Sequence, residues 1–200
     1  DWRFTGDANV FLGHNHQTRL FADYAAWESQ NWAMGTATHD VKGGRLTFTA
    51  MASLEPLTMD PAGSPQLFQT GESYRSIPLV NLQHPHDALM GLGVTYRLVR
   101  SETTTYTFGA DLVGSPTLGP TAFMHRESAR SNPQVPIPHH FLDSTHITPG
   151  VLRAGVTVGA WTFEGSGFRG AEPDDDRWNV EQPEIDSWAA GVVWRRGPGQ

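Results

Sequence analysis

The sequence contains no cysteine, which excludes disulfide bonds, thiolate metal sites and a cysteine nucleophile. It has only 14 Lys and Arg against 21 Asp and Glu, and no basic run, so the sequence predicts no nucleic-acid partner. No apolar stretch reaches the ~18–20 residues that a transmembrane helix needs. A membrane β-barrel is still allowed, because its strands alternate in polarity and are not hydrophobic on average.

Glycine and proline are abundant by contrast, with 21 and 14 residues. This composition is not that of a helix bundle, and seven Trp with ten Phe are not typical of a disordered chain. The length fits one domain over residues 1–200 or a fragment of a larger barrel. No signal peptide is visible, and the first residues, DWRFTG, already have the pattern of a strand. We therefore expect a mature form or a piece of a longer chain.

Alternation of apolar and polar residues is the main structural signal. Over residues 88–98, one face carries Ala, Met, Leu, Val, Tyr and Leu, and the other carries Leu, two Gly, Thr and Arg. A period of two indicates a β-strand, because a helix would scatter these residues around its axis. No segment predicts a helix. The same pattern gives about eight strands in all, the others being 4–12, 45–55, 104–112, 152–159 and 187–194, with 31–40 and 163–170 weaker.

The connections between these segments alternate strictly between short and long. In an up-and-down meander, this alternation puts all short turns at one end and all long loops at the other, as in outer-membrane barrels. We therefore predict an all-β fold: an antiparallel up-and-down meander of the outer-membrane β-barrel type, complete or partial, in the bacterial outer membrane. The short connections are 41–44, 99–103 and 159–162, and the long ones are 14–30, 56–87, 114–149 and 171–186.

The second face of the predicted strands is rich in Gly, Thr and Ser and poor in Lys and Glu. Such residues suit the wall of a lumen, while the apolar face meets outer-membrane lipid. Aromatic residues near strand ends are typical of the belts at membrane interfaces: Trp2, Tyr96, Tyr106, Trp188 and Trp194. The alternative is a soluble antiparallel barrel of lipocalin type, or a sandwich.

Eight of the nine histidines fall at the long-loop end, His39 being the exception. In the stretch HPHD, proline pushes His84 toward extended geometry, in which residues i and i+2 point the same way. His84 and His86 can then reach one metal ion, with Asp87 as a further ligand or as an orienting group. The stretch HNH at 14–16 has the same spacing.

A second cluster, PHHFLDSTHIT, supplies His139, His140, Asp143 and His146. Joined to the HPHD residues, it predicts a transition-metal site for copper or zinc, because imidazole and carboxylate ligands suit these ions. The spacing does not match the HExxH zinc motif. Two interpretations stay open: these histidines bind a metal, or they only tie the loops together, with Asp87 capping backbone amides.

Six strings stand in or beside the long loops: SLEPLT (53–58), LFQTGE (67–72), QHPHD (83–87), GPTAFMHR (119–126), HHFLDSTHIT (139–148) and AEPDDDRW (171–178). Together they resemble a family of uncharacterised Gram-negative outer-membrane proteins, over most of the chain. Members are usually longer and have no established activity. The resemblance implies a barrel in the bacterial envelope, with loops that form a packed cap or plug.

These signals favour envelope binding or transport of a transition-metal ion or another small solute. Glu55, Arg126 and Glu172 are expected as structural partners in the loop network. Two alternatives remain: a metal-dependent hydrolase on a barrel scaffold, with a loop carboxylate as base, and a structural porin-like barrel without metal. The chain has no GxSxG, P-loop or GxGxxG motif, so a catalytic role is not the interpretation that the sequence favours.

Overall fold

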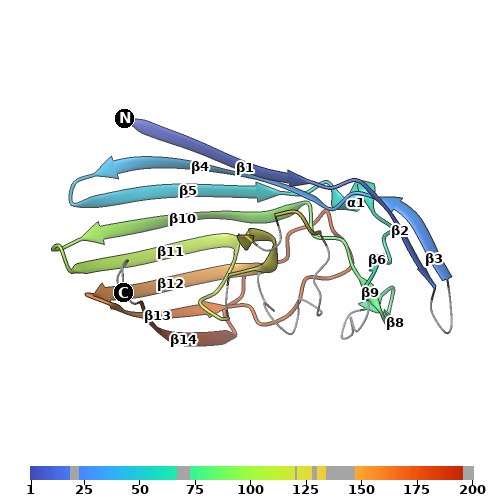
Figure 1. The fold of residues 1–200 in the computed structure, drawn as a ribbon. Helices are drawn as coiled ribbons and strands as arrows, with labels where there is room; N and C mark the ends of the chain where they lie inside the picture. Colours follow the sequence, from blue (N-terminus) through green and yellow to red (C-terminus); the bar gives the residue numbers. More distant parts are fainter. Residues whose placement is uncertain (19–22, 67–72, 120, 128–129, 134–146, 196–200) are drawn as a thin grey trace.

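The chain folds around one large antiparallel β-sheet. A computed structural model describes residues 1–18, 23–66, 73–119, 121–127, 130–133 and 147–195. Eight strands lie in the sheet in chain order, each beside the next of the set (Figure 1). They are β1 (Trp2–Val10), β4 (Asn31–Val41), β5 (Gly44–Ala52), β10 (Leu89–Val99), β11 (Thr104–Gly114), β12 (Thr148–Val158), β13 (Trp161–Phe168) and β14 (Ser187–Trp194).

This arrangement confirms the predicted all-β antiparallel meander of about eight strands. The register is well specified, because a slip of one residue would exchange the apolar and polar faces of a strand. The short turns lie together at one end of the sheet and the long connections at the other, as predicted (Figure 1). Between β4 and β5 the turn is only Lys42 and Gly43, and Gly43 has a φ of +80°, which glycine adopts without steric cost.

The two outer strands of the sheet each have one paired side. β1 pairs with β4, and β14 pairs with β13. In the part of the chain that the structure describes, no pairing joins β1 to β14, so the sheet is open there. None of the helices in the described ranges is long and apolar enough to cross a membrane.

The long connections contain more regular structure than the sequence predicted. β2 (Gly13–Thr18) and β3 (Asp23–Glu28) form a hairpin, and one helical turn, α1 (Glu55–Thr58), follows β5 where no helix was expected. Pro56 suits the first turn of α1, because the amide hydrogen that proline lacks has no helical partner there. The smaller elements are β6 (Ser64–Pro65) paired with β9 (Leu82–Gln83), β7 (Ser73–Tyr74) paired with β8 (Ile77–Pro78), and the 3₁₀ turn η1 (Phe123–His125).

Buried apolar side chains gather at the end of the sheet that carries the long connections. Most of them lie in the sheet strands near that end, and two belong to the connections themselves. Full burial of such a side chain stabilises the fold by about 1.5–3 kcal/mol. These residues therefore hold the connections onto the sheet: Met51, Met59, Leu79, Met90, Val113, Val151 and Phe168.

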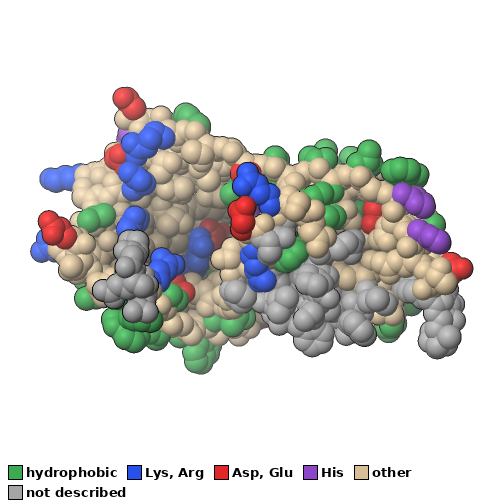
Figure 2. Space-filling view, in the orientation of Figure 1, with side chains coloured by type: hydrophobic (Ala, Val, Ile, Leu, Met, Phe, Trp, Pro, Cys, Tyr) green, Lys and Arg blue, Asp and Glu red, His purple; other side chains and the backbone are tan. Residues whose placement is uncertain are grey.

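Away from that end, the two faces of the sheet differ in polarity. The apolar face carries large side chains that stay exposed, among them Phe48 (44%), Phe108 (48%) and Leu152 (53%). Figure 2 shows hydrophobic side chains projecting from the outline of the molecule. The opposite, polar face carries threonines, glycines and the ion pair of Asp111 with Arg153. Most of the sheet thus keeps its apolar face uncovered by the described residues.

Candidate functional site

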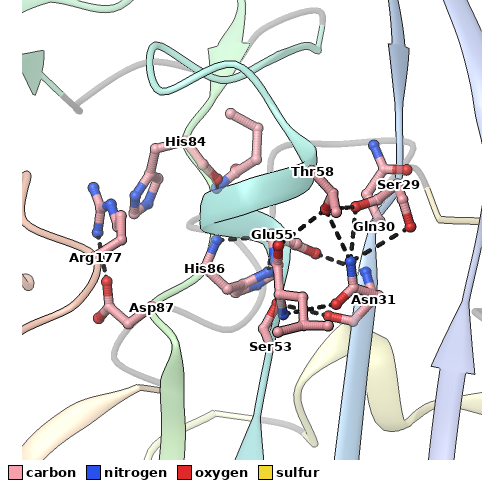
Figure 3. Close-up of polar contacts among 12 residues, drawn as sticks. Ser29, Gln30, Asn31, Ser53, Glu55, Thr58, His84, His86, Asp87 and Arg177 are labelled. Carbon is pink, nitrogen blue, oxygen red and sulfur yellow. Dashed lines mark hydrogen bonds and ion pairs between the residues drawn. The ribbon is translucent and has the colours of Figure 1, made fainter.

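The carboxylate of Glu55 is the centre of a polar cluster at the connection end of the sheet. Glu55 follows β5 as the first residue of α1 and is only 3% exposed. Its Oε2 accepts the backbone N–H of His86 at 2.9 Å and lies 2.8 Å from His86 Nδ1 (Figure 3). Its Oε1 accepts the backbone N–H of Asn31 at 3.2 Å. One side chain therefore joins the start of β4, the end of β5 and the segment before β10.

The charges of Glu55 and His86 shift the pKa values of both groups. Burial raises the pKa of Glu55, but the His86 charge and the hydrogen bonds from His86 and Asn31 outweigh it, so the net pKa lies below 4.5. Burial lowers the pKa of His86, but the Glu55 carboxylate outweighs it, and the net pKa lies above 6.5. Each group thus favours the charged form of the other.

Asn31 completes the cluster on the β4 side. Its Oδ1 accepts the backbone N–H of Leu54 at 2.7 Å, and its Nδ2 donates to Thr58 Oγ1 at 3.0 Å. The hydroxyl of Ser53 donates to the Asn31 carbonyl at 2.8 Å and accepts the Glu55 N–H at 2.9 Å. These bonds fix α1 against the first residue of β4, so the Glu55 carboxylate has little freedom to turn away from His86.

Asp87 forms a second ion pair beside the first. Arg177 Nη1 donates to Asp87 Oδ1 at 3.1 Å, and the side chains are 11% and 9% exposed, respectively. The Arg177 carbonyl also accepts the backbone N–H of Ala88 at 2.8 Å. Burial raises the pKa of Asp87 more than the Arg177 charge and hydrogen bond lower it. The pair therefore holds a desolvated carboxylate whose charge depends on Arg177.

The two histidines of HPHD point to different partners. Figure 3 shows the ring of His86 toward Glu55 and the ring of His84 beside Arg177. His84 lines an open cleft of about 520 Å³, and its charge also acts on Asp87. The other lining residues include Arg177 and four acidic residues: Glu172, Asp174, Asp175 and Asp176. Glu172, which was expected in the loop network, thus lies in the same cleft as His84.

The predicted metal site is only partly within the described structure. His139, His140, Asp143 and His146 lie outside the described residues, so their role as ligands stays a prediction. Within the described ranges, no group of three or more His, Asp and Glu is arranged to hold a metal ion. What the described part provides is one imidazole, His86, oriented by a carboxylate, which fixes the ring as it does for many histidine ligands.

Sequence reasoning identified Glu55 as a loop partner but missed Asn31 and Arg177. Asn31 is the first residue of its strand, a position where polar residues often bind backbone groups. Arg177 was visible as the cation inside the acidic string AEPDDDRW. Arg126, which was expected in the loop network, donates from Nε to the Thr121 carbonyl at 2.6 Å. The ring of His125 packs edge-on against Trp32 at the start of β4.

The ion pair on the polar face was also missed. Arg153 Nη2 on β12 lies 2.8 Å from Asp111 Oδ2 on β11 and donates to Oδ1 at 3.0 Å. Glycines make room for it: a Cβ at Gly93 or Gly114 would overlap the Asp111 carboxylate, and one at Gly109 would touch the guanidinium at 3.0 Å. A charge of each sign among small residues of adjacent strands was the signal that could have revealed this pair.

Comparison with known proteins adds no relative to this picture. No protein-family model, curated protein or solved structure matches the chain. The resemblance to Gram-negative outer-membrane proteins therefore stays a prediction. Three of the strings that carry it nevertheless meet at one junction: SLEPLT supplies Glu55, QHPHD supplies His86 and Asp87, and AEPDDDRW supplies Arg177.

Proposed function

We propose that the chain is part of an outer-membrane β-barrel that binds or passes small polar solutes along its polar face. The carrying observation is the exposed apolar face of the eight-stranded sheet. Phe4, Trp188 and Val192 on the outer strands are 76%, 82% and 59% exposed, and Phe48, Phe108 and Leu152 on inner strands are also exposed. An uncovered apolar surface over a whole sheet is unfavourable in water and suits lipid.

The ends of the strands agree with this proposal. Near the short turns, the ring of Trp2 stacks on His39 with centroids 4.9 Å apart, and Trp161 lies beside Trp194 at 6.4 Å. Amphipathic aromatic rings favour the interface between lipid and water. At the other end, the connections are fixed to the sheet by the Glu55 cluster and the buried apolar side chains. We infer that they form a cap over one mouth of the lumen.

The polar face supplies the chemistry of the lumen. Its threonines pair across strands, as in the contact between the hydroxyls of Thr157 and Thr162 at 2.9 Å. The Asp111–Arg153 pair offers a polar solute both an acceptor and a donor. A small polar solute is therefore the cargo class that this face suits.

Adjacent residues of β11 give a matched test of the two faces. Phe108→Lys puts a charge on the proposed lipid face, where it should destabilise the barrel by about 2–4 kcal/mol. Thr107→Lys puts the same charge on the polar face and should be tolerated. The measurements are the folded yield in lipid vesicles and resistance to unfolding in detergent. Equal behaviour of both variants, together with a wild-type protein that stays soluble without detergent, would contradict the proposal and favour a soluble barrel.

A second candidate is binding of a transition-metal ion, copper or zinc, by the loop histidines. The observation in its favour is the pairing of His86 Nδ1 with the buried Glu55 carboxylate at 2.8 Å, the usual way in which proteins orient an imidazole ligand. The test is metal analysis of detergent-purified protein before and after His84→Ala/His86→Ala. The metal content should fall in the variant, and equal content in both proteins would remove these two residues from any site.

A further inference from the structure

The β2–β3 hairpin is anchored to the rest of the protein through one of its faces. Asn15 Nδ2 donates to Glu28 Oε1 at 3.0 Å and to Ser64 Oγ at 3.1 Å, and Gln17 Nε2 donates to the Pro65 carbonyl at 3.0 Å. Ser64 in turn donates to the buried Glu28 carboxylate at 2.6 Å. The odd-numbered residues of β2 thus face inward and fix the hairpin on β6.

The even-numbered residues of β2 consequently face outward. His14 and His16 are both exposed, and their ring centroids are 6.4 Å apart with the planes inclined by 25°. Figure 2 shows histidine side chains on the surface at the place where Figure 1 draws the β2–β3 hairpin. The cross-strand neighbours are Trp27 beside His14 and Ala25 beside His16. Because Ala25 is small, the space beside the His16 ring is left open on the β3 side.

We propose that His14 and His16 form a two-imidazole binding site for a divalent transition-metal ion of the Cu²⁺ or Ni²⁺ class. A metal bonded to two ring nitrogens at about 2.0–2.1 Å brings the rings to the separation that i, i+2 residues of a paired strand allow. Because both rings are exposed, rotation of the two side chains can direct one nitrogen of each ring toward a shared ion. Imidazole suits these ions, and affinity for a given site is greatest for Cu²⁺.

The site differs in kind from a closed structural metal centre. Two protein ligands leave the other coordination positions to water, so the ion is accessible and exchanges readily. The hairpin is held by Asn15 and Gln17 whether or not the metal is bound, so binding does not have to order the backbone. The net charge of −7 also favours approach of a cation. The site lies outside the polar face of the sheet and does not depend on the proposed lumen.

Trp27 provides a local reporter for this site. Its ring centroid is 5.3 Å from that of His14, and its side chain is 73% exposed. Cu²⁺ bound by His14 should therefore quench the fluorescence of Trp27. The quenching that is lost in Trp27→Phe is the contribution of Trp27. This difference separates its signal from that of the other six tryptophans.

The experiment is a Cu²⁺ titration of the detergent-solubilised full chain at neutral pH. His14→Ala/His16→Ala should weaken the Trp27 quenching by about tenfold or more in Cu²⁺ concentration, about 1.4 kcal/mol or more. His39→Ala/His125→Ala removes the same number of histidines elsewhere and should leave the curve unchanged. Trp27 quenching that is absent in wild type, or equal in wild type and His14→Ala/His16→Ala, overturns the proposal.

Discussion

The stretches HNH at 14–16 and HPHD at 84–87 have the same spacing of histidines and opposite surroundings. In HNH, β2 is paired with β3 along its whole length, and His14 and His16 stand side by side in solvent. In HPHD, the backbone lies between β9 and β10, and each ring meets a different partner from a distant part of the chain. The i, i+2 rule holds where hydrogen bonds to a neighbouring strand keep the backbone pleated.

The two regions also differ in what their histidines contribute. The HPHD segment joins β10 to α1 through His86 and to the connection before β14 through Asp87. Its charged side chains therefore stabilise the packing of the connections. The HNH segment contributes its odd-numbered residue to the fold and leaves its histidines exposed. The same spacing of histidines therefore serves the packing of the connections in HPHD and leaves two rings exposed to solvent in HNH. Substitutions in both regions test this difference.

The largest effect is expected for Glu55→Ala. It removes the acceptor of two backbone N–H groups and the partner of the His86 ring, all at a buried site. Removing one member of a buried ion pair typically lowers the free energy of unfolding by about 3–5 kcal/mol. Denaturant unfolding in detergent measures the change. The control is Glu127→Ala, whose side chain is 86% exposed and pairs with Arg130, and which should cost less than about 1 kcal/mol.

A smaller loss is expected for Arg177→Ala, which removes a single charged hydrogen bond from Asp87. Leaving this buried carboxylate without the guanidinium should lower the free energy of unfolding by about 2–3 kcal/mol. The double variant Asp87→Ala/Arg177→Ala removes the uncompensated charge as well. It should therefore be more stable than the sum of the single changes indicates. Strict additivity in denaturant unfolding would show that the two side chains do not act as a pair.

The change in the free energy of unfolding with pH is expected to be smaller than the change caused by Glu55→Ala or Arg177→Ala, because titration leaves the packing in place. The lowered pKa of Glu55 stabilises the fold above pH 4.5, and this contribution is lost as the pH falls through the folded-state pKa. The raised pKa of His86 stabilises the fold below pH 6.5, and this contribution is lost as the pH rises through the folded-state pKa. The pair therefore contributes fully between about pH 4.5 and 6.5.

His86→Asn tests this window, because its amide can donate from the position of Nδ1 but does not titrate. The stability difference between wild type and the variant should be largest inside the window and shrink on both sides. The measurement is denaturant unfolding at a series of pH values. Parallel curves for the two proteins would mean that the His86 charge does not contribute.

The smallest effect is expected for His14→Ala/His16→Ala in the absence of metal. Both rings are exposed, and the contacts that anchor the hairpin come from Asn15 and Gln17. The free energy of unfolding should change by no more than about 0.5 kcal/mol. A loss as large as that of Arg177→Ala would show that the fold depends on both histidine pairs and would remove the contrast between them.

The sheet was predictable from sequence because a two-residue period is a local property. Residues 88–98 were predicted as a strand, and β10 spans Leu89–Val99. The β2–β3 hairpin was missed, because its outward face carries histidines and its inward face carries Asn and Gln, so polarity does not alternate. Glu55 was predicted as the end of a strand and instead begins α1, since its carboxylate is held by Asn31 and His86.

The site was less predictable because its contacts join residues far apart in the chain. Nothing near Asp87 in the sequence indicates Arg177, which is 90 residues away. The purpose of Gly93 is likewise visible only when the register places Asp111 opposite it. Residue spacing predicted which side chains carry the chemistry, whereas their partners depended on how the strands align.

The alternation of short and long connections also predicts an order of assembly. The hairpins β4–β5, β10–β11 and β12–β13 close over a few residues each, so they form with little loss of loop entropy. Pairing β5 with β10, or β11 with β12, requires closure of loops of more than 30 residues and is expected to be slower. Glu55 lies just after the β4–β5 hairpin, and His86 lies just before the β10–β11 hairpin. Their contact is therefore expected to form late, when the two completed hairpins pack against each other.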